Sequence, residues 1–301
     1  MSTAHPNALA ALDRAPVWLN SEPLSAEALR GKVVLVDFWT YSCVNWLRTL
    51  PYVRAWAERY EDDGLVVVGA HAPEFSFEHD LGNVRRAITE LSVSYPVVID
   101  NEFAIWRSFG NHYWPAVYLV DQTGRVRFTH FGEEAYAETE RAVQELVGVD
   151  GDLVRVAAGG LSEAADWDKL QSPETYVGYE RGERRTDAPA NQLALNQWTL
   201  DGGWSVDDES AVLDSSPGSI ACRFEARDLN MVLGGGPARF TVRLDGEPPG
   251  EDQGVDVSAS GDGVVDEPRM FQLVRQRQAR ARTVELTFHD AGVRAYVFTF
   301  G

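Results

Sequence analysis

Residues 32–50 read KVVLVDFWTYSCVNWLRTL, and this stretch decides the fold. It opens with the run Val33–Trp39, which is apolar, rich in β-branched residues and interrupted only by Asp37. Such a run is typical of a strand that is buried on both faces of a parallel sheet. A four-residue turn, 40–43, follows, and a helical pattern begins at Val44. The stretch therefore predicts a buried strand, a tight turn and a helix.

The turn ends in Cys43, directly before the predicted helix. The first turn of a helix carries unpaired backbone N–H groups and the positive end of the helix dipole. Both favour a thiolate over a thiol, so cysteines in this position titrate below the ~8.5 of a free thiol. We therefore expect Cys43 to be a reactive, anion-prone thiol. The alternative is a buried thiol without chemistry.

The composition limits the partners and cofactors. The chain has 301 residues, of which 44% are hydrophobic, enough for one large domain or two ordinary ones. Its formal net charge of −19 argues against nucleic acid and against an anionic membrane surface as partners. Cys43 and Cys222 lie far apart and are too few for a cysteine-rich metal site. The spacing of His71, His79 and His112 does not support a histidine site, and His71 is expected to be hydrogen-bonded or on the surface. We expect no metal and no cofactor.

Strands and helices alternate through the first half of the chain, which predicts an α/β domain over residues 1–150 after an irregular lead-in, 1–24. The domain ends in a hairpin whose turn, 121–124, has Gly124 to supply a positive φ. The predicted strands are Val33–Trp39, Leu65–Ala70, Tyr95–Ile99, Ala116–Val120 and Val126–Phe131. The predicted helices are Val44–Tyr60, Phe77–Leu91, Phe103–Phe109 and Tyr136–Val147.

The pattern changes after Val149. Residues 151–190 are predicted to be a linker with short elements, and residues 191–301 to be short strands separated by Gly, Asp and Pro turns. That spacing indicates an all-β sandwich or jelly roll. Cys222 lies in one of these strands and is expected to be inert. The predicted strands are Trp198–Leu200, Ile220–Ala226, Phe240–Leu244, Arg269–Leu273, Thr283–Phe288 and Val293–Phe300.

Two segments carry a resemblance to a known family. FWTYSCVNWLRTLPYVRAW at 38–56 and YWPAVYLVDQTGRV at 113–126 resemble the active-site and cis-proline segments of thioredoxin-like proteins of the TlpA/DipZ type, which are redoxins and thiol-disulfide oxidoreductases. HAPEF at 71–75 and FGEEAYAETE at 131–140 fit the same family. The resemblance implies a thioredoxin-like domain followed by a β-sandwich domain similar to carbohydrate-binding modules.

The chain departs from this family at Trp46. The family carries a Cys-x-x-Cys pair, whose first cysteine matches Cys43 and whose second position is Trp46. A second thiol would attack a mixed disulfide from within the chain, and Trp has none. We therefore expect a monothiol oxidoreductase whose Cys43 is resolved by an external thiol or reductase. The alternatives are a one-cysteine peroxidase, which is an antioxidant, and a redox-inactive protein that binds partners through the groove of the fold.

Three further residues are candidate catalytic groups. Thr40, three residues before Cys43, matches the threonine that orients peroxide in peroxiredoxins, or else it caps the turn. The resemblance implies that Glu74 lies near the thiol and assists proton transfer, and that Asp37 is a buried acid that relays protons beneath it. The alternatives are that Glu74 is a solvated loop acid and that Asp37 points outward at a strand edge.

The resemblance also implies that the bond before Pro115 is cis and that the backbone there pairs with an extended substrate segment. The alternative is an ordinary proline that leads a strand. Tyr41, Trp46 and Trp114 complete the predicted substrate surface, although Trp46 could equally be packed inside. The expected substrate is a protein disulfide or the disulfide of a small thiol.

The C-terminal domain has a candidate glycan surface. Tyr176, Tyr179, Trp198 and Trp204 could stack on sugar rings, but aromatic residues in short strands more often form core. Both interpretations stay open at this point.

The sequence also predicts a compartment. No apolar run approaches the ~20 residues of a membrane helix, and the N-terminus lacks a basic segment followed by an apolar core. These features predict a cytoplasmic protein without a membrane partner. Because DipZ-type proteins lie outside the cytoplasmic membrane, the alternative is an extracytoplasmic protein whose precursor was trimmed.

Overall fold

The computed structural model describes residues 8–301, and the chain divides into two compact units. The first unit ends at Ser162 and the second is Glu163–Gly301. The predicted lead-in lies partly outside the described residues, since 1–7 are not among them. Each unit has a sheet of its own and is described by itself.

The sheet of the first unit has the strand order β1-β4-β3-β2-β5-β6 within residues 8–162. Its central strand β2 pairs in parallel with β3 and antiparallel with β5, and every residue of β2 is buried. The prediction of a strand buried on both faces is confirmed, and the nearly continuous apolar run explains it. The strands are β1 (Trp18–Leu19), β2 (Val33–Trp39), β3 (Leu65–His71), β4 (Val97–Ile99), β5 (Ala116–Val120) and β6 (Val126–Phe131).

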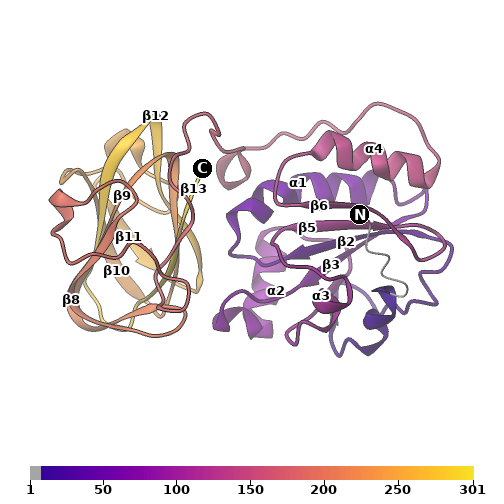
Figure 1. The fold of residues 1–301 in the computed structure, drawn as a ribbon, viewed down its shortest axis with the longest axis horizontal. Helices are drawn as coiled ribbons and strands as arrows, with labels where there is room; N and C mark the ends of the chain where they lie inside the picture. Colours follow the sequence, from indigo (N-terminus) through magenta and orange to yellow (C-terminus); the bar gives the residue numbers. More distant parts are fainter. Residues whose placement is uncertain (1–7) are drawn as a thin grey trace. The chain divides into compact units, whose positions relative to one another are not determined.

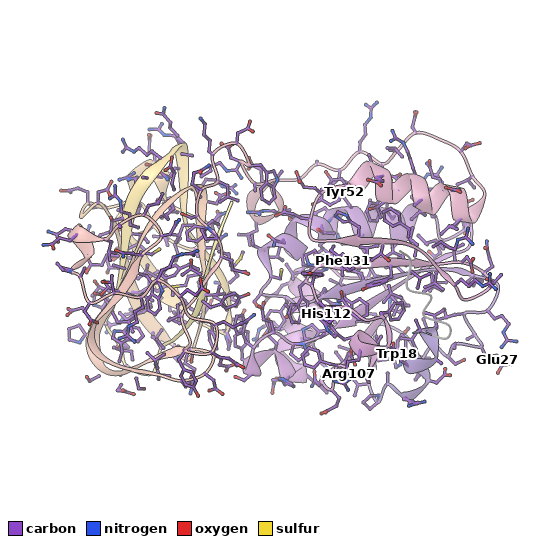
Figure 2. The ribbon with its side chains drawn as sticks, in the orientation of Figure 1. Trp18, Glu27, Tyr52, Arg107, His112 and Phe131 are labelled. Carbon is purple, nitrogen blue, oxygen red and sulfur yellow. The ribbon has the colours of Figure 1, made fainter. Side chains whose placement is uncertain are left out.

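Helices cover both faces of this sheet, so the first unit is a thioredoxin-like α/β sandwich (Figure 1). Figure 1 shows α1 and α4 beside each other on one face. Helix α3 packs on the other face, where Ile105 shares a core with Val36 of β2. Helix α2 lies beside α1, since Arg54 of α1 donates to the carbonyl of Leu91 at the end of α2 at 2.9 Å. Tyr52 of α1, labelled in Figure 2, stacks on Tyr136 of α4 with 3.7 Å between ring centroids. The helices are η1 (Ala8–Arg14), α1 (Val44–Arg59), η2 (Ser76–His79), α2 (Leu81–Glu90), α3 (Ala104–Ser108), α4 (Tyr136–Val147) and η3 (Gly160–Ser162).

One predicted helix differs in a way that matters for the site. The predicted helix Phe77–Leu91 is broken into η2 and α2, because Asp80 leaves the helical conformation and caps α2. The Asp80 carboxylate accepts a hydrogen bond from the backbone N–H of Asn83 at 3.0 Å. A short acidic side chain is a favoured N-cap, so a helix restarts there. The break places η2 in a loop that runs from the end of β3.

The second unit is an all-β domain whose sheet has the order β11-β10-β12-β9-β13-β7, with β8 also paired to β9. Two of its strands are long, where the sequence predicted only short ones. Register shifts along the β9–β12 pair let one strand continue past a bulge, so turn-like residues do not end it. The elements are β7 (Thr175–Tyr176), η4 (Ala190–Gln192), β8 (Trp198–Val206), β9 (Ala211–Gly234), β10 (Ala238–Leu244), η5 (Gly250–Asp252), β11 (Asp262–Val265), β12 (Arg269–Phe288) and β13 (Arg294–Phe300).

The second unit begins earlier than the predicted boundary at residue 191. Strand β7 pairs with β13 through Tyr176 and Val297, so part of the predicted linker 151–190 belongs to the sheet. No helix within residues 8–301 has both the length and the apolar character that crossing a membrane requires.

Candidate functional site

Cys43 is the N-cap residue of α1, with an extended backbone at φ −78° and ψ 113°. Its backbone N–H donates to the carbonyl of Thr40 at 3.3 Å, and its carbonyl accepts from the N–H of Leu47 at 3.0 Å. The thiol is half-buried and forms no disulfide. Cys43 therefore lies at the amino end of a 16-residue helix, which is the place the sequence predicted.

The bond between Trp114 and Pro115 is cis, which confirms that prediction. Pro115 directly precedes β5, and its carbonyl accepts a hydrogen bond from Gly132 at 2.8 Å. The Trp114 indole donates to the carbonyl of Ala72 at 3.0 Å and packs on Trp106, with 4.3 Å between ring centroids. These contacts fix the loop before β5. Pairing of a substrate with this backbone stays a prediction.

Trp46 occupies the position of the missing second thiol, and its side chain is fully buried. The indole stacks on Trp39, with ring centroids 4.2 Å apart, and its Nε1 donates to Oδ2 of Asp37 at 3.0 Å. The interpretation of Trp46 as an aromatic surface for partners is therefore wrong. The packing alternative holds, because a side chain without exposure meets no partner. Tyr41 is also buried and stacks on His71, at 6.0 Å.

Asp37 is fully buried in the middle of β2, so the alternative of an outward-facing acid is wrong. Its Oδ2 also accepts a hydrogen bond from the hydroxyl of Tyr95 at 3.3 Å. Burial raises the pKa of Asp37 to about 7, and the hydrogen bonds from Trp46 and Tyr95 oppose that rise. The space around this acid is tight: a Cβ on Gly69 would lie 2.8 Å from the indole nitrogen of Trp39.

Glu78 is a functional candidate that the sequence reasoning missed. The carboxyl is fully buried. Its Oε1 accepts from the Ser42 hydroxyl at 2.5 Å, and its Oε2 accepts from the backbone N–H of Glu74 at 2.5 Å and of Phe75 at 3.0 Å. Burial raises its pKa to about 7, and the Ser42 and Thr40 hydroxyls oppose that rise. The sequence carries no signal for this position, because a capping box has Ser or Thr three residues before the acid and Phe75 stands there.

Two predicted catalytic residues lie around this carboxyl. Thr40 is fully buried, and its hydroxyl has no hydrogen-bond partner among the described residues, although it is near enough to Glu78 to lower the pKa of that carboxyl. Glu74 is half-buried at the start of the loop, and its backbone N–H donates to the Glu78 carboxyl. The structure thus brings Thr40, Glu74 and the Cys43 turn to one place through Glu78.

His71 differs from its prediction. It is fully buried at the end of β3, and neither ring nitrogen has a hydrogen-bond partner among the described residues. Burial lowers the pKa of His71 to about 3, and the charge of His79 lowers it further. The interpretation as a hydrogen-bonded or surface histidine is wrong. Within residues 8–301, His, Cys, Asp and Glu form no group of three or more suited to a metal ion.

The predicted glycan surface is not one exposed face. Trp198 is buried in the core of the second unit, and its indole donates to the carbonyl of Glu183 at 2.7 Å. Trp204 packs against that core beside Phe288, with ring centroids 5.9 Å apart. Tyr179 is 69% exposed. The core interpretation therefore holds for Trp198.

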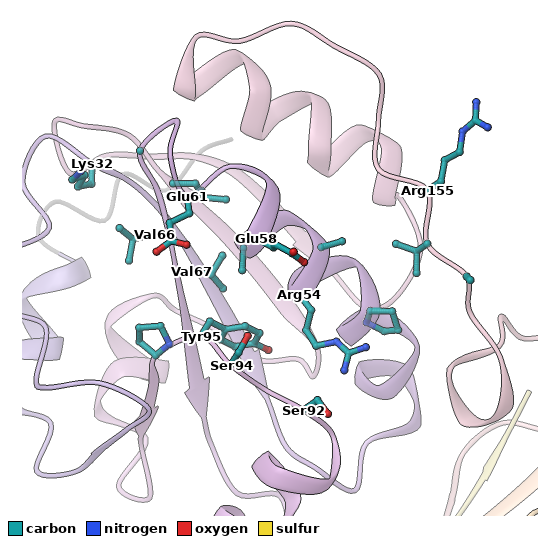
Figure 3. Close-up of a pocket in the computed structure, with 18 residues that line it drawn as sticks. Lys32, Arg54, Glu58, Glu61, Val66, Val67, Ser92, Ser94, Tyr95 and Arg155 are labelled. Carbon is teal, nitrogen blue, oxygen red and sulfur yellow. The ribbon is translucent and has the colours of Figure 1, made fainter.

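A cavity of about 880 Å³ lies between α1 and β3, under the segment that carries Arg155 (Figure 3). Figure 3 shows Arg54 and Glu58 of α1 on one side of the cavity, with Val66 and Val67 of β3 across from them. Cys43 and Pro115 are not among its lining residues. Because the thiol does not line it, this cavity is not part of the site around Cys43.

Comparison with known proteins gives two family matches. Residues 13–146 match the Redoxin family, and residues 172–301 match the family described as thioredoxin like C-terminal domain. Protein DipZ of Mycobacterium tuberculosis is 35% identical over 301 residues, which is 94% of this chain and 41% of DipZ. The chain thus spans about two fifths of the length of that relative.

Two further matches each cover less than half of this chain. The thiol-disulfide oxidoreductase YkuV of Bacillus subtilis is 29% identical over 130 residues, or 43% of this chain and 87% of YkuV. The solution structure of a thioredoxin-like protein in the oxidized form is 30% identical, covers 45% of this chain and 91% of its own, and has a TM-score of 0.41.

Proposed function

We propose that this chain, which belongs to the thioredoxin-like redoxin family, is a monothiol thiol-disulfide oxidoreductase that acts through Cys43. The observation that carries the proposal is the pair of positions at the start of α1. Cys43 caps the helix, and Trp46, where the family has its second cysteine, is buried and holds no thiol. A disulfide across this turn cannot form.

The reaction has three exchange steps. The Cys43 thiolate attacks one sulfur of a substrate disulfide; the substrate S–S bond breaks, and one substrate thiolate leaves and takes a proton from water. A mixed disulfide between Cys43 and the other half of the substrate remains. An external thiolate then attacks the Cys43 sulfur, so that the second substrate thiolate leaves and takes a proton, and Cys43 is left in a mixed disulfide with the external thiol. A second external thiolate attacks the external sulfur of that disulfide and releases the Cys43 thiolate. Two external thiols thus end as one disulfide, while the substrate gains two electrons and two protons.

The substrate surface is the loop before β5; Tyr41 is buried and does not extend it. Support comes from the two contacts that fix Trp114, the hydrogen bond to the carbonyl of Ala72 and the packing on Trp106. An extended segment of a protein disulfide is the substrate that such a backbone accepts by strand addition. A small-thiol disulfide is the minimal substrate. Asp37, Thr40 and Glu74 keep their predicted catalytic roles as part of this proposal.

The test is the mixed disulfide itself. The protein is incubated with oxidised glutathione and its intact mass is measured. We expect one glutathione adduct, on Cys43, that is released by added dithiothreitol. Cys43→Ser should abolish the adduct and Cys222→Ala should not. Hydrogen peroxide consumption that is lost in Cys43→Ser, without an adduct, would favour the one-cysteine peroxidase instead. If Cys43 reacts with neither oxidised glutathione nor hydrogen peroxide, the redox-inactive binding protein is the interpretation that remains.

A further inference from the structure

Two fully buried carboxyls flank the turn that carries Cys43, and they have different partners. Asp37 lies on the strand before the turn, and its Oδ2 is bonded by the side chains of Trp46 and Tyr95. Glu78 lies on η2 and is bonded by Ser42, the residue next to the thiol. Glu78 is therefore the acid whose carboxyl is tied directly to the turn 40–43, whereas the bonds to Asp37 come from α1 and from the segment before β4.

The contacts of Glu78 join two segments of the chain. On one side its carboxyl accepts from the Ser42 hydroxyl, and Ser42 is only 1% exposed. On the other side it accepts from the backbone N–H groups of Glu74 and Phe75. A buried carboxyl with several donors is held in place, because each lost bond would leave a polar atom unsatisfied. The loop before η2 therefore fixes the residue that precedes Cys43.

We infer that Glu78 is a positioning residue for Cys43, which orders the thiol-bearing turn through Ser42 and whose charge governs how readily the thiol ionises. This inference rests on the proposed function, since it concerns the same thiol. The inference goes beyond the proposed function because it assigns to Glu78 the control of thiol ionisation, which the family resemblance would assign to Asp37.

The direction of this control follows from the charge of Glu78. The pKa of Glu78 is raised to about 7 by burial, and the charge of Glu74, on the same loop, adds to the rise. From the turn, the groups that act on Glu78 are the Ser42 and Thr40 hydroxyls, which do not titrate here. As the pH rises through about 7, Glu78 gains a negative charge that disfavours the neighbouring thiolate. The pH profile of Cys43 ionisation should therefore show a second step, which comes from the titration of Glu78.

The experiment measures the rate of Cys43 alkylation by iodoacetamide from pH 5 to 9. In the wild type we expect two steps, one from the thiol and one near pH 7. Glu78→Gln should remove the step near pH 7 and raise the rate at pH 8 roughly threefold to tenfold, as the loss of one nearby negative charge would. Ser42→Ala should move the step to higher pH, because the Ser42 hydrogen bond lowers the pKa of Glu78.

The controls separate the outcomes. Glu90→Gln, at an exposed acid on α2, should leave the profile unchanged. A Glu78→Gln profile that superimposes on the wild type overturns the inference, as does loss of the step in Asp37→Asn instead. If Glu78→Gln does not fold, a Ser42→Ala profile identical to wild type overturns it. Absence of the glutathione adduct defeats the proposed function alone, because alkylation reports on Glu78 without any disulfide. A Cys43 that is not alkylated at any pH overturns both.

Discussion

The Trp46 indole nitrogen donates a hydrogen bond to Oδ2 of Asp37 at 3.0 Å, and both side chains are fully buried. The residue at the position of the second thiol thus donates to one oxygen of the buried acid, whereas Oδ1 has no hydrogen-bond partner among the described residues. The indole also stacks on Trp39, so the substitution fills space as well as a hydrogen-bonding position. A large aromatic donor at this position is compatible with the fold because the acid accepts its bond.

Trp46→Phe should therefore destabilise the first unit. Phe is smaller than the buried indole, and Oδ2 of Asp37 keeps only the hydrogen bond from Tyr95 at 3.3 Å. The loss of the hydrogen bond alone costs about 0.5–1.5 kcal/mol. Hydrogen–deuterium exchange of peptides from β2 and α1 follows this unit separately from the second. Trp167→Phe, at a side chain that is 47% exposed, is the matched control and should leave that exchange unchanged. Equal protection in the two variants would contradict the role of the indole donor.

Asp37→Asn should change how stability depends on pH. The pKa of Asp37 is about 7 in the folded chain and 3.8 as its ordinary value, so the folded state binds the proton more tightly. The stability from this group is full below about pH 4 and is lost as the pH rises to about 7. The Asn side chain does not titrate, so the variant does not lose stability at this position as the pH rises. Its unfolding free energy relative to wild type should rise by a few kcal/mol between pH 4 and 8, since each tenfold change in proton affinity corresponds to about 1.4 kcal/mol.

Urea titrations of both proteins at pH 4, 6 and 8 measure this difference. His71 has the opposite sign, because a pKa lowered to about 3 makes stability rise between pH 3 and 6.5. His71 and Glu78 are present in both proteins, so their effects cancel in the comparison. A difference that stays constant from pH 4 to 8 would show that Asp37 does not titrate in this range.

Local patterns predicted the parts of the fold that depend on neighbours in sequence. The apolar run of β2, the start of α1 after Cys43 and the span of α4 were all found where periodicity placed them. The cis bond at Pro115 came from the resemblance, since periodicity carries no information on it. The strand β2 and the bounds of the two helices depend on only a few adjacent residues, which is why local patterns predict them.

The parts that were missed depend on contacts between distant residues. Glu78 is buried where Ser42, 36 positions earlier, donates to it, and an acid in a predicted amphipathic helix gives no sign of that. Trp46 is buried because its indole donates to Asp37 and stacks on Trp39. Its residue type alone is equally compatible with a surface position. The long strands β9 and β12 depend on bulges, which the sequence does not mark.

Alkylation should distinguish the two cysteines in the native protein. Cys222 is 1% exposed in β9, and burial raises its pKa to about 12. The thiolate is the nucleophile, so Cys222 should not react at pH 8. Peptide mapping after iodoacetamide treatment should find label on Cys43 alone, and on both residues after denaturation. Native labelling of Cys222 would contradict its burial, and Cys222→Ala should label as the wild type does at Cys43.

Removing one partner of the buried ion pair between Arg48 and Glu133 should strongly destabilise the first unit. Their side chains are 2% and 5% exposed, and Nη1 of Arg48 lies 2.8 Å from Oε1 of Glu133. The pair joins α1 to the loop after β6. Arg48→Met should cost about 3–5 kcal/mol, because it leaves a buried carboxylate without this partner.

The double variant Arg48→Met/Glu133→Leu should recover much of that loss, since replacing both charges removes the cost of burying one alone. Arg59→Met is the matched control on the same helix. Arg59 is 54% exposed in a pair with Asp63, so its loss should cost at most about 1 kcal/mol. Urea unfolding of wild type, Arg48→Met, Glu133→Leu and the double variant gives the cycle, with Arg59→Met measured beside them. If Arg48→Met and Arg59→Met lose the same stability, burial does not set the strength of this pair, and α1 is held to the β6 loop by packing alone.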